Sequence, residues 1–173
     1  LANYSDIPVI NALSDLEHPC QALADLLTIY EKKGELGGLT LAFLGDGNNV
    51  AHSLMLAASL VGMNSRIDSH KGYAVQERVL LTAQGYARES GAEIFCTEKP
   101  QLVVSGADVV YTDVWTSMGQ EAEAEQRRQI LADYQVNSEL LSLAKEDAIL
   151  MHPLPAHHGE EVAKGILDIP RSV

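Results

Sequence analysis

Residues 17–21 read Glu-His-Pro-Cys-Gln and stand directly before a run with helical apolar spacing. Proline is best tolerated in the first turn of a helix, so the pattern predicts a helix start with His18 at the cap and Gln21 in the first turn. The free amides of a helix start attract phosphate or carboxylate, and His18 and Gln21 would add hydrogen-bond donors. The alternative is that both side chains only cap the helix, and spacing alone favours that interpretation.

Residues 45–53 read Gly-Asp-Gly-Asn-Asn-Val-Ala-His-Ser and follow the first predicted strand. The two glycines allow a tight turn and close approach by a ligand, as in a dinucleotide fingerprint, but Val50 occupies the place of the third glycine. Asn48 and Asn49 offer side-chain amides that could orient an amino-acid-like ligand. The alternative is a turn in which the asparagines supply left-handed backbone geometry.

Residues 113–119 follow the fourth predicted strand and place an acid and a hydroxyl four residues apart. Asp113 would suit an ammonium group, and Gly119 could be the hinge of a closing loop. The alternative is that Asp113 and Ser117 cap the following helix.

Residues 152–161 follow the last predicted strand. Prolines on both sides of Leu154 predict a rigid turn, with a cis bond before Pro155 as one form, and the fixed Leu154 carbonyl could receive a substrate amine. His157 and His158 are adjacent, so they point in different directions on regular backbone, and no matching cysteine or carboxylate cluster accompanies them. We therefore expect surface histidines and no metal site.

Short apolar runs alternate with helical segments along the chain, which predicts an α/β fold: a Rossmann-like doubly wound parallel sheet of about five strands, with helices on both faces. The expected strands are residues 41–44, 65–68, 93–96, 107–112 and 148–151, and the expected helices are residues 19–33, 50–61, 75–90, 121–132 and 138–143, with Ser138 as an N-cap. Ligands of such sheets bind beyond the carboxyl ends of the strands, so the motifs that follow strands should meet there.

The chain has 173 residues, with 24 acidic and 12 basic side chains and a formal net charge of −12. This length fits one domain over residues 1–173, and the acidic balance disfavours nucleic acid or an anionic membrane surface as a partner. Two cysteines, Cys20 and Cys96, form no secreted-type framework, so we expect a cytoplasmic protein. The longest apolar stretch, residues 54–63, is too short to span a membrane. Because the chain begins at Leu1, we expect a fragment with an upstream part missing.

Taken together and in this order, the motifs resemble the transcarbamoylase family over essentially the whole chain, and most closely its ornithine-specific members. The resemblance implies that His18 and Gln21 contact the carbamoyl group of carbamoyl phosphate. It also implies that the amino-acid end of L-ornithine is held by the side chains of Asn49, Asp113 and Ser117 and by the backbone of Met118.

The fourth motif departs from the ornithine pattern. Ornithine-specific members usually carry His-Cys-Leu-Pro, whereas residues 152–155 read His-Pro-Leu-Pro, as in aspartate-specific members. Ala156 stands where those members usually have arginine, so a cationic amino acid remains the expected substrate. By resemblance, His152 helps to position the carbamoyl group, Pro153 lies at the substrate, and the Leu154 carbonyl orients the attacking amine.

The resemblance implies that the parent protein converts carbamoyl phosphate and L-ornithine to L-citrulline and phosphate, as a homotrimer and without metal or organic cofactor. We expect the family's N-terminal carbamoyl-phosphate domain and final helix to be absent from this chain, and we therefore expect the chain alone to be inactive.

Three other interpretations stay open from the sequence. One is a transcarbamoylase for another amine or amino acid, such as aspartate, putrescine or acylated ornithine. A second is a nucleotide-binding module, suggested by Gly45 and Gly47 after one strand and Asp68 at the end of the next. The third is an interaction or regulatory domain that keeps the fold without turnover.

Overall fold

A computed structural model describes residues 2–117, 119 and 121–173 of the chain. Its centre is a five-stranded parallel sheet with the strand order β3-β2-β1-β4-β5. The strands are β1 (Thr40–Leu44), β2 (Asn64–Asp68), β3 (Ile94–Thr97), β4 (Val109–Thr112) and β5 (Ile149–Met151). This sheet confirms the α/β prediction and all five predicted strands, with ends shifted by two residues at most.

The strand order creates a crevice at the end of the sheet where the strands have their carboxyl termini. The chain runs outward from β1 to β3 and then returns to pair β4 with the other side of β1. Connections on the two sides of such a reversal leave in opposite directions, so the carboxyl ends of β1 and β4 flank an open space. The turn at residues 45–49 and the loop at residues 113–119 both begin there.

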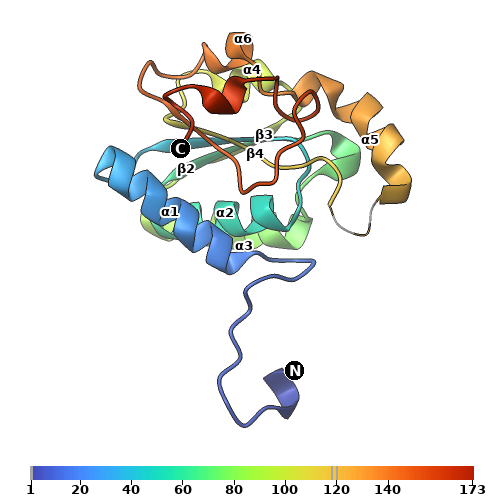
Figure 1. Cartoon of the computed structure of the whole chain (residues 1–173). Coiled ribbons are helices and arrows are strands. Elements are labelled where there is room, and N and C mark those ends of the chain that lie inside the picture. Colours follow the sequence, from blue (N-terminus) through green and yellow to red (C-terminus); the bar gives the residue numbers. More distant parts are fainter. Residues whose placement is uncertain (1, 118, 120) are drawn as a thin grey trace.

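Helices cover both faces of the sheet (Figure 1). One face carries α1 (Pro19–Lys33), α2 (Asn49–Leu60) and α3 (Glu77–Ser90), and the other carries α4 (Pro100–Val104) and α6 (Ser138–Leu141), while α5 (Ala124–Leu131) lies to one side. Short 3-10 turns form at Ala2–Tyr4, Lys71–Tyr73, Glu121–Glu123, Ala132–Tyr134 and Ile166–Asp168. The segment before α1 leaves the body of the fold in an extended form (Figure 1).

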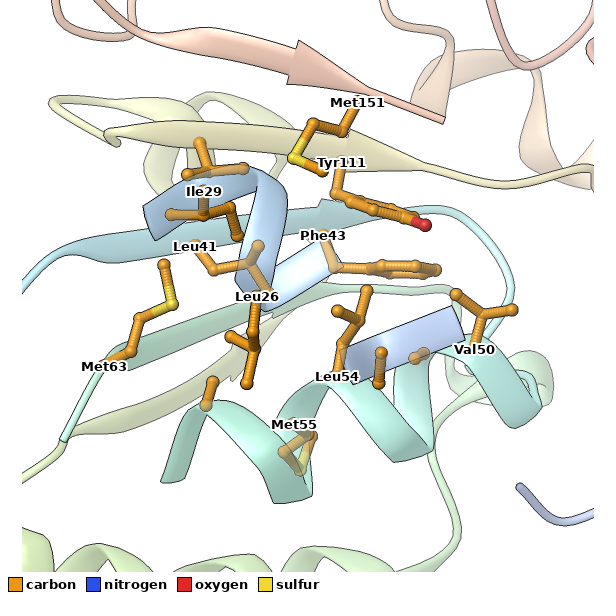
Figure 2. Packing of buried hydrophobic residues seen from close by; sticks show 14 of the residues in the cluster. Leu26, Ile29, Leu41, Phe43, Val50, Leu54, Met55, Met63, Tyr111 and Met151 are labelled. Carbon is orange, nitrogen blue, oxygen red and sulfur yellow. The ribbon is translucent and has the colours of Figure 1, made fainter. Parts of the chain in front are cut away.

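Alternate residues of the strands supply two separate cores, because successive side chains of a strand point to opposite faces. Leu41 and Phe43 pack with α1 and α2, whereas Ala42 and Leu44 pack with α4 and α6. Figure 2 shows the first core, in which the rings of Phe43 and Tyr111 stack with their centroids 5.9 Å apart. This packing fixes the central strands β1 and β4, which lead into the crevice.

The helix predictions are confirmed with local differences. The predicted helix at residues 121–132 is divided into a 3-10 turn, α5 and the start of a second turn, and the five-residue helix α4 had no sequence signal. Ser138 is not the cap of α6, because Asn137 accepts the hydrogen bond from the Leu140 N–H at 2.8 Å. No helix in the described ranges is long and apolar enough to cross a bilayer.

Candidate active site

A cleft of about 840 Å³ opens at the crevice between β1 and β4. Its walls come from the starts of α1 and α2, the loop after β4 and the turn after β5. The residues that were predicted as site residues and that line this cleft are His18, Gln21, Asn49, Asp113, Ser117, Pro153 and Leu154. Met118 lies outside the described residues, and His152 lies beneath the cleft surface.

The start of α1 presents His18 and Gln21 to the cleft without using either as a cap. His18 occupies the cap position but makes no side-chain capping bond, and its backbone N–H donates to Ser53 Oγ at 2.8 Å. Its ring Nδ1 is buried and has no hydrogen-bond partner among the described residues. The capping interpretation is therefore wrong for this helix start.

A buried chain of hydrogen bonds fixes the amide of Gln21. Gln21 Nε2 donates to Asp25 Oδ1 at 2.9 Å, and Tyr111 Oη donates to Asp25 Oδ2 at 2.9 Å. Burial raises the pKa of Asp25, although the hydrogen bonds from Gln21 and Tyr111 act in the opposite direction. Burial also raises the pKa of Tyr111, so this phenol remains protonated and remains a donor. Because Tyr111 belongs to β4, this strand helps to set the orientation of the Gln21 side chain.

Asn48 joins the first turn to the loop after β4. Its Oδ1 accepts hydrogen bonds from the N–H groups of Val50 and Ala51 and so caps α2, while its Nδ2 donates to Asp113 Oδ2 at 2.7 Å. The backbone of Asn48 is extended, with φ −81°, and Asn49 is the first residue of α2. The alternative in which the asparagines supply left-handed geometry is therefore wrong.

Asn49 lines the cleft and also a neighbouring cavity of about 720 Å³. Its Nδ2 donates to the backbone oxygen of Ser14 at 2.8 Å. The side chain thereby ties the segment before α1 to the cleft entrance, and a ligand that used this amide nitrogen would compete with Ser14.

Asp113 is a nearly buried carboxylate at the carboxyl end of β4, with 8% of the residue exposed. Burial raises its pKa, while hydrogen bonds from Asn48 Nδ2 and the Val114 N–H favour the ionised form. Asp113 does not cap a helix, because α5 begins only at Ala124. A cationic ligand would offset the cost of burying this charge.

The turn after β5 is built around His152. The Leu154–Pro155 bond is cis, which confirms the predicted form, and Leu154 has φ 58°. The Leu154 N–H donates to His152 Nδ1 at 2.9 Å, so the ring proton resides on Nε2, 3.2 Å from Glu161 Oε1. Only 1% of the His152 side chain is exposed. Both ring nitrogens of His152 are thus used within the turn, and its part in positioning the carbamoyl group stays a prediction.

A buried ion pair that was not anticipated holds the loop after β4. Arg127 Nη1 lies 2.7 Å from Asp46 Oδ2 and donates to the backbone oxygen of Trp115 at 3.0 Å. The guanidinium also lies over the ring of Tyr73, with Cζ 4.5 Å from its centroid. Burial raises the pKa of Asp46, and Arg127 opposes that shift. Asp46, which stands between two glycines, was a signal visible in the sequence. Its pairing with Arg127, 81 residues later, was not predictable from the sequence.

The geometry disfavours a nucleotide at the glycine turn. A Cβ on Gly47 would lie 2.3 Å from the backbone nitrogen of Val75. The space left by the missing side chain is therefore filled by the backbone near Val75 and not by a ligand. Asp68, the candidate ribose ligand, is 0% exposed and cannot reach a surface ligand.

Comparisons with known proteins agree with this geometry. Residues 37–173 match the family model described as the Asp/Orn binding domain of aspartate/ornithine carbamoyltransferase, and residues 1–31 match its carbamoyl-P binding domain. An ornithine carbamoyltransferase from Anoxybacillus flavithermus is 58% identical over 172 residues, covering 99% of this chain and 55% of that protein.

Solved ornithine carbamoyltransferases have the same fold. Those from Pyrococcus furiosus and Gloeobacter violaceus are 52% and 46% identical, with TM-scores of 0.95 and 0.92. The match covers 99% of this chain in both cases, and 55% and 57% of those chains, so this chain spans just over half the length of the relatives. Because a single family model accounts for residues 37–173 and the solved relatives share the fold around the cleft, the chain belongs to the aspartate/ornithine carbamoyltransferase family.

Proposed function

We propose that this chain forms the ornithine-binding part of an enzyme that transfers the carbamoyl group of carbamoyl phosphate to L-ornithine. The observation that carries the proposal is the convergence of Asn49, Asp113 and Leu154 on the same cleft as His18 and Gln21. Amino-acid-binding groups and carbamoyl-binding groups then face one space, which the reaction requires.

The charge arrangement suits the unreacting end of ornithine. Asp113 would bind the α-ammonium group, with Ser117 beside it in the wall of the cleft. Pro153 adds an apolar edge where a side chain with methylene groups can lie. Binding energy at this end would orient the far amine.

The far amine must be neutral to attack. A free alkylamine has a pKa of about 10.4, so on the order of one molecule in a thousand is neutral near pH 7. The Leu154 carbonyl would accept a hydrogen bond from this amine as it attacks the carbonyl carbon of carbamoyl phosphate. The tetrahedral intermediate loses a proton from nitrogen and expels phosphate, which gives citrulline. His18 and Gln21 would stabilise the charge on the carbamoyl oxygen.

An exposed apolar row on α1 supports a second part of the protein beside this one. Leu23, Leu27 and Tyr30 lie on one side of the helix and are all more than half exposed. Residues 1–31 match the carbamoyl-P domain, so we propose that this row packs against the rest of that domain. We also propose that the whole protein is a homotrimer. We propose that it is cytoplasmic, because the exposed free thiols of Cys20 and Cys96 fit a reducing compartment.

We also propose that residues 1–173 fold as one unit, although the two family models divide the chain before β1. The buried side chains of α1, including Leu26 and Ile29, share a core with Leu41 and Tyr111 of the sheet. Separating α1 from the sheet would expose this core.

The test is to join this chain to the upstream part of the Pyrococcus furiosus relative and to measure carbamoyl transfer from carbamoyl phosphate. Citrulline formation from L-ornithine that greatly exceeds transfer to aspartate, putrescine or acetylated ornithine supports the proposal. Preference for one of the other amines would identify a different transcarbamoylase. Calorimetric binding of NAD to this chain, with no binding of ornithine, would favour the nucleotide module. A folded fusion with no turnover would favour the interaction domain.

A further inference from the structure

The rim of the cleft carries His157 and Glu160, which the proposed reaction does not use, and the buried Glu161 lies next to them. One ligand atom each from His157, Glu160 and Glu161 lies within 4.8 Å of the other two. The sequence argued against a metal here because no carboxylate cluster matched the histidines. The fold supplies that cluster, since the turn after β5 brings Glu160 and Glu161 back beside His157.

Glu161 is a buried carboxylate with one oxygen that lacks a hydrogen-bond partner among the described residues. Its side chain is fully buried, and the oxygen without such a partner is Oε2. That oxygen lies 4.0 Å from His157 Nδ1, which is too far for a hydrogen bond. A buried carboxylate oxygen without a partner carries a desolvation cost that a cation would remove.

The other oxygen of Glu161 is already fixed. Glu161 Oε1 accepts hydrogen bonds from the His157 N–H at 2.5 Å and from His152 Nε2 at 3.2 Å. Burial would raise the pKa of Glu161, but the hydrogen bonds from His152 and from backbone N–H groups act in the opposite direction, and the pKa is lowered overall. Outer hydrogen bonds of this kind orient the carboxylates of metal sites.

The spacing suits a small ion after modest closure. Tetrahedral bonds of about 2.0–2.1 Å place two ligand atoms roughly 3.3 Å apart. His157 Nδ1 and Glu161 Oε2 are 4.0 Å apart. They must therefore move roughly 0.7 Å closer to bind one tetrahedral zinc ion. The His157 side chain is 51% exposed and Glu160 is 25% exposed, so both can rotate toward the fixed Glu161.

We propose that His157, Glu160 and Glu161 bind one divalent transition-metal ion, with solvent completing its coordination. One imidazole and two carboxylates form a donor set suited to zinc or cobalt. Glu160 Oε1 pairs with Arg128 Nε at 2.9 Å, so the ion competes with Arg128 for this carboxylate. The proposal does not depend on the proposed transferase activity.

The test measures zinc binding by competition with a chromophoric chelator, and cobalt binding by visible absorption, on this chain. Cys20→Ser and Cys96→Ser form the background, because exposed thiolates bind the same ions. His157→Ala and Glu160→Gln are the test variants, and His158→Ala is the matched control on the adjacent exposed histidine. Glu161 is left intact because its hydrogen bonds support the turn.

We expect one ion per chain, affinity reduced at least tenfold by His157→Ala and by Glu160→Gln, and affinity within twofold of the background in His158→Ala. Circular dichroism of each variant confirms that the fold is retained. The proposal is overturned by the absence of saturable binding below millimolar zinc, by binding that His157→Ala leaves unchanged, or by an equal loss in His158→Ala.

Discussion

Asn48 Nδ2 donates a 2.7 Å hydrogen bond to Asp113 Oδ2, while Oδ1 of the same Asn48 side chain caps α2. One amide therefore links the end of β1, the start of α2 and the carboxylate after β4. The orientation of the acid proposed to bind the substrate ammonium is set by the neighbouring strand turn.

Replacing Asn48 separates these two roles. Asn48→Ser keeps a good capping residue but cannot reach Asp113, whereas Asn48→Ala loses both interactions. We expect Asn48→Ala to lower the free energy of unfolding by about 0.5–2 kcal/mol and Asn48→Ser to stay near the unmodified chain. In the fused enzyme both variants should raise KM for ornithine about tenfold, since a hydrogen bond to a charged group contributes about 1.5–3 kcal/mol. An unchanged KM in both variants would show that Asp113 does not need Asn48.

Asp113→Asn removes the proposed partner of the ammonium and keeps the shape of the side chain. Because burial already raises the pKa of Asp113, the loss of this charge should cost the free chain little stability. Ornithine affinity should fall about 10–100-fold, as expected for loss of a charge-assisted hydrogen bond. Urea unfolding and substrate-dependence curves measure the two effects. A folded Asp113→Asn variant with unchanged ornithine affinity would contradict the assigned role.

Asp68 makes the stability of this chain depend on pH. It is 0% exposed, neither carboxylate oxygen has a hydrogen-bond partner among the described residues, and burial together with Glu98 raises its pKa to about 7. The folded chain therefore holds this proton more tightly than the unfolded chain, whose aspartate pKa is about 3.9. The contribution of Asp68 to stability should fall as pH rises from about 4 to about 7 and stay low above that range.

Asp68→Asn tests this dependence because the amide stays neutral. The variant should match the unmodified chain at about pH 4 and below, and exceed it above pH 7 by roughly 1–3 kcal/mol. Urea unfolding at a series of pH values gives the comparison. Parallel curves for the two chains would mean that Asp68 ionises without cost in the fold.

Arg127 ties α5 to the loop that carries Trp115. Arg127→Met leaves Asp46 buried without its charged partner, so the free energy of unfolding should fall by about 3–5 kcal/mol. Adding Asp46→Asn should restore part of that loss. Trp115 is the only tryptophan, so its fluorescence reports the loop directly and should shift toward an exposed environment in Arg127→Met. A double variant no more stable than the single one would show that the pair is not coupled.

Local patterns in the sequence predicted the sheet and most of the cleft. Apolar runs identified the strands, and the rule that parallel strands end at one edge brought together motifs as distant as His18 and Leu154. The partners of these residues were not predictable in the same way. Asp46 with Arg127, and Asn48 with Asp113, meet only after the sheet has ordered its strands, and no periodicity encodes that pairing.

His152 shows which contacts of a motif residue the sequence does not predict. Its position after β5 was predicted correctly, but the two ring nitrogens are used by Leu154 and Glu161. The tight turn through the following prolines folds the Leu154 N–H back onto the ring. A hydrogen bond between residues two apart depends on backbone angles that the sequence does not state.

We propose that the cleft at the β1–β4 crevice binds an α-amino acid through Asn49, Asp113 and Leu154. Titration of the isotope-labelled chain with L-ornithine, followed by amide chemical shifts, measures this binding residue by residue. We expect saturable shifts concentrated at residues 49, 113 and 154, and weaker shifts with putrescine, which lacks the carboxylate. Shifts confined to another surface, or equal responses to the two amines, would show that the cleft does not recognise an amino acid.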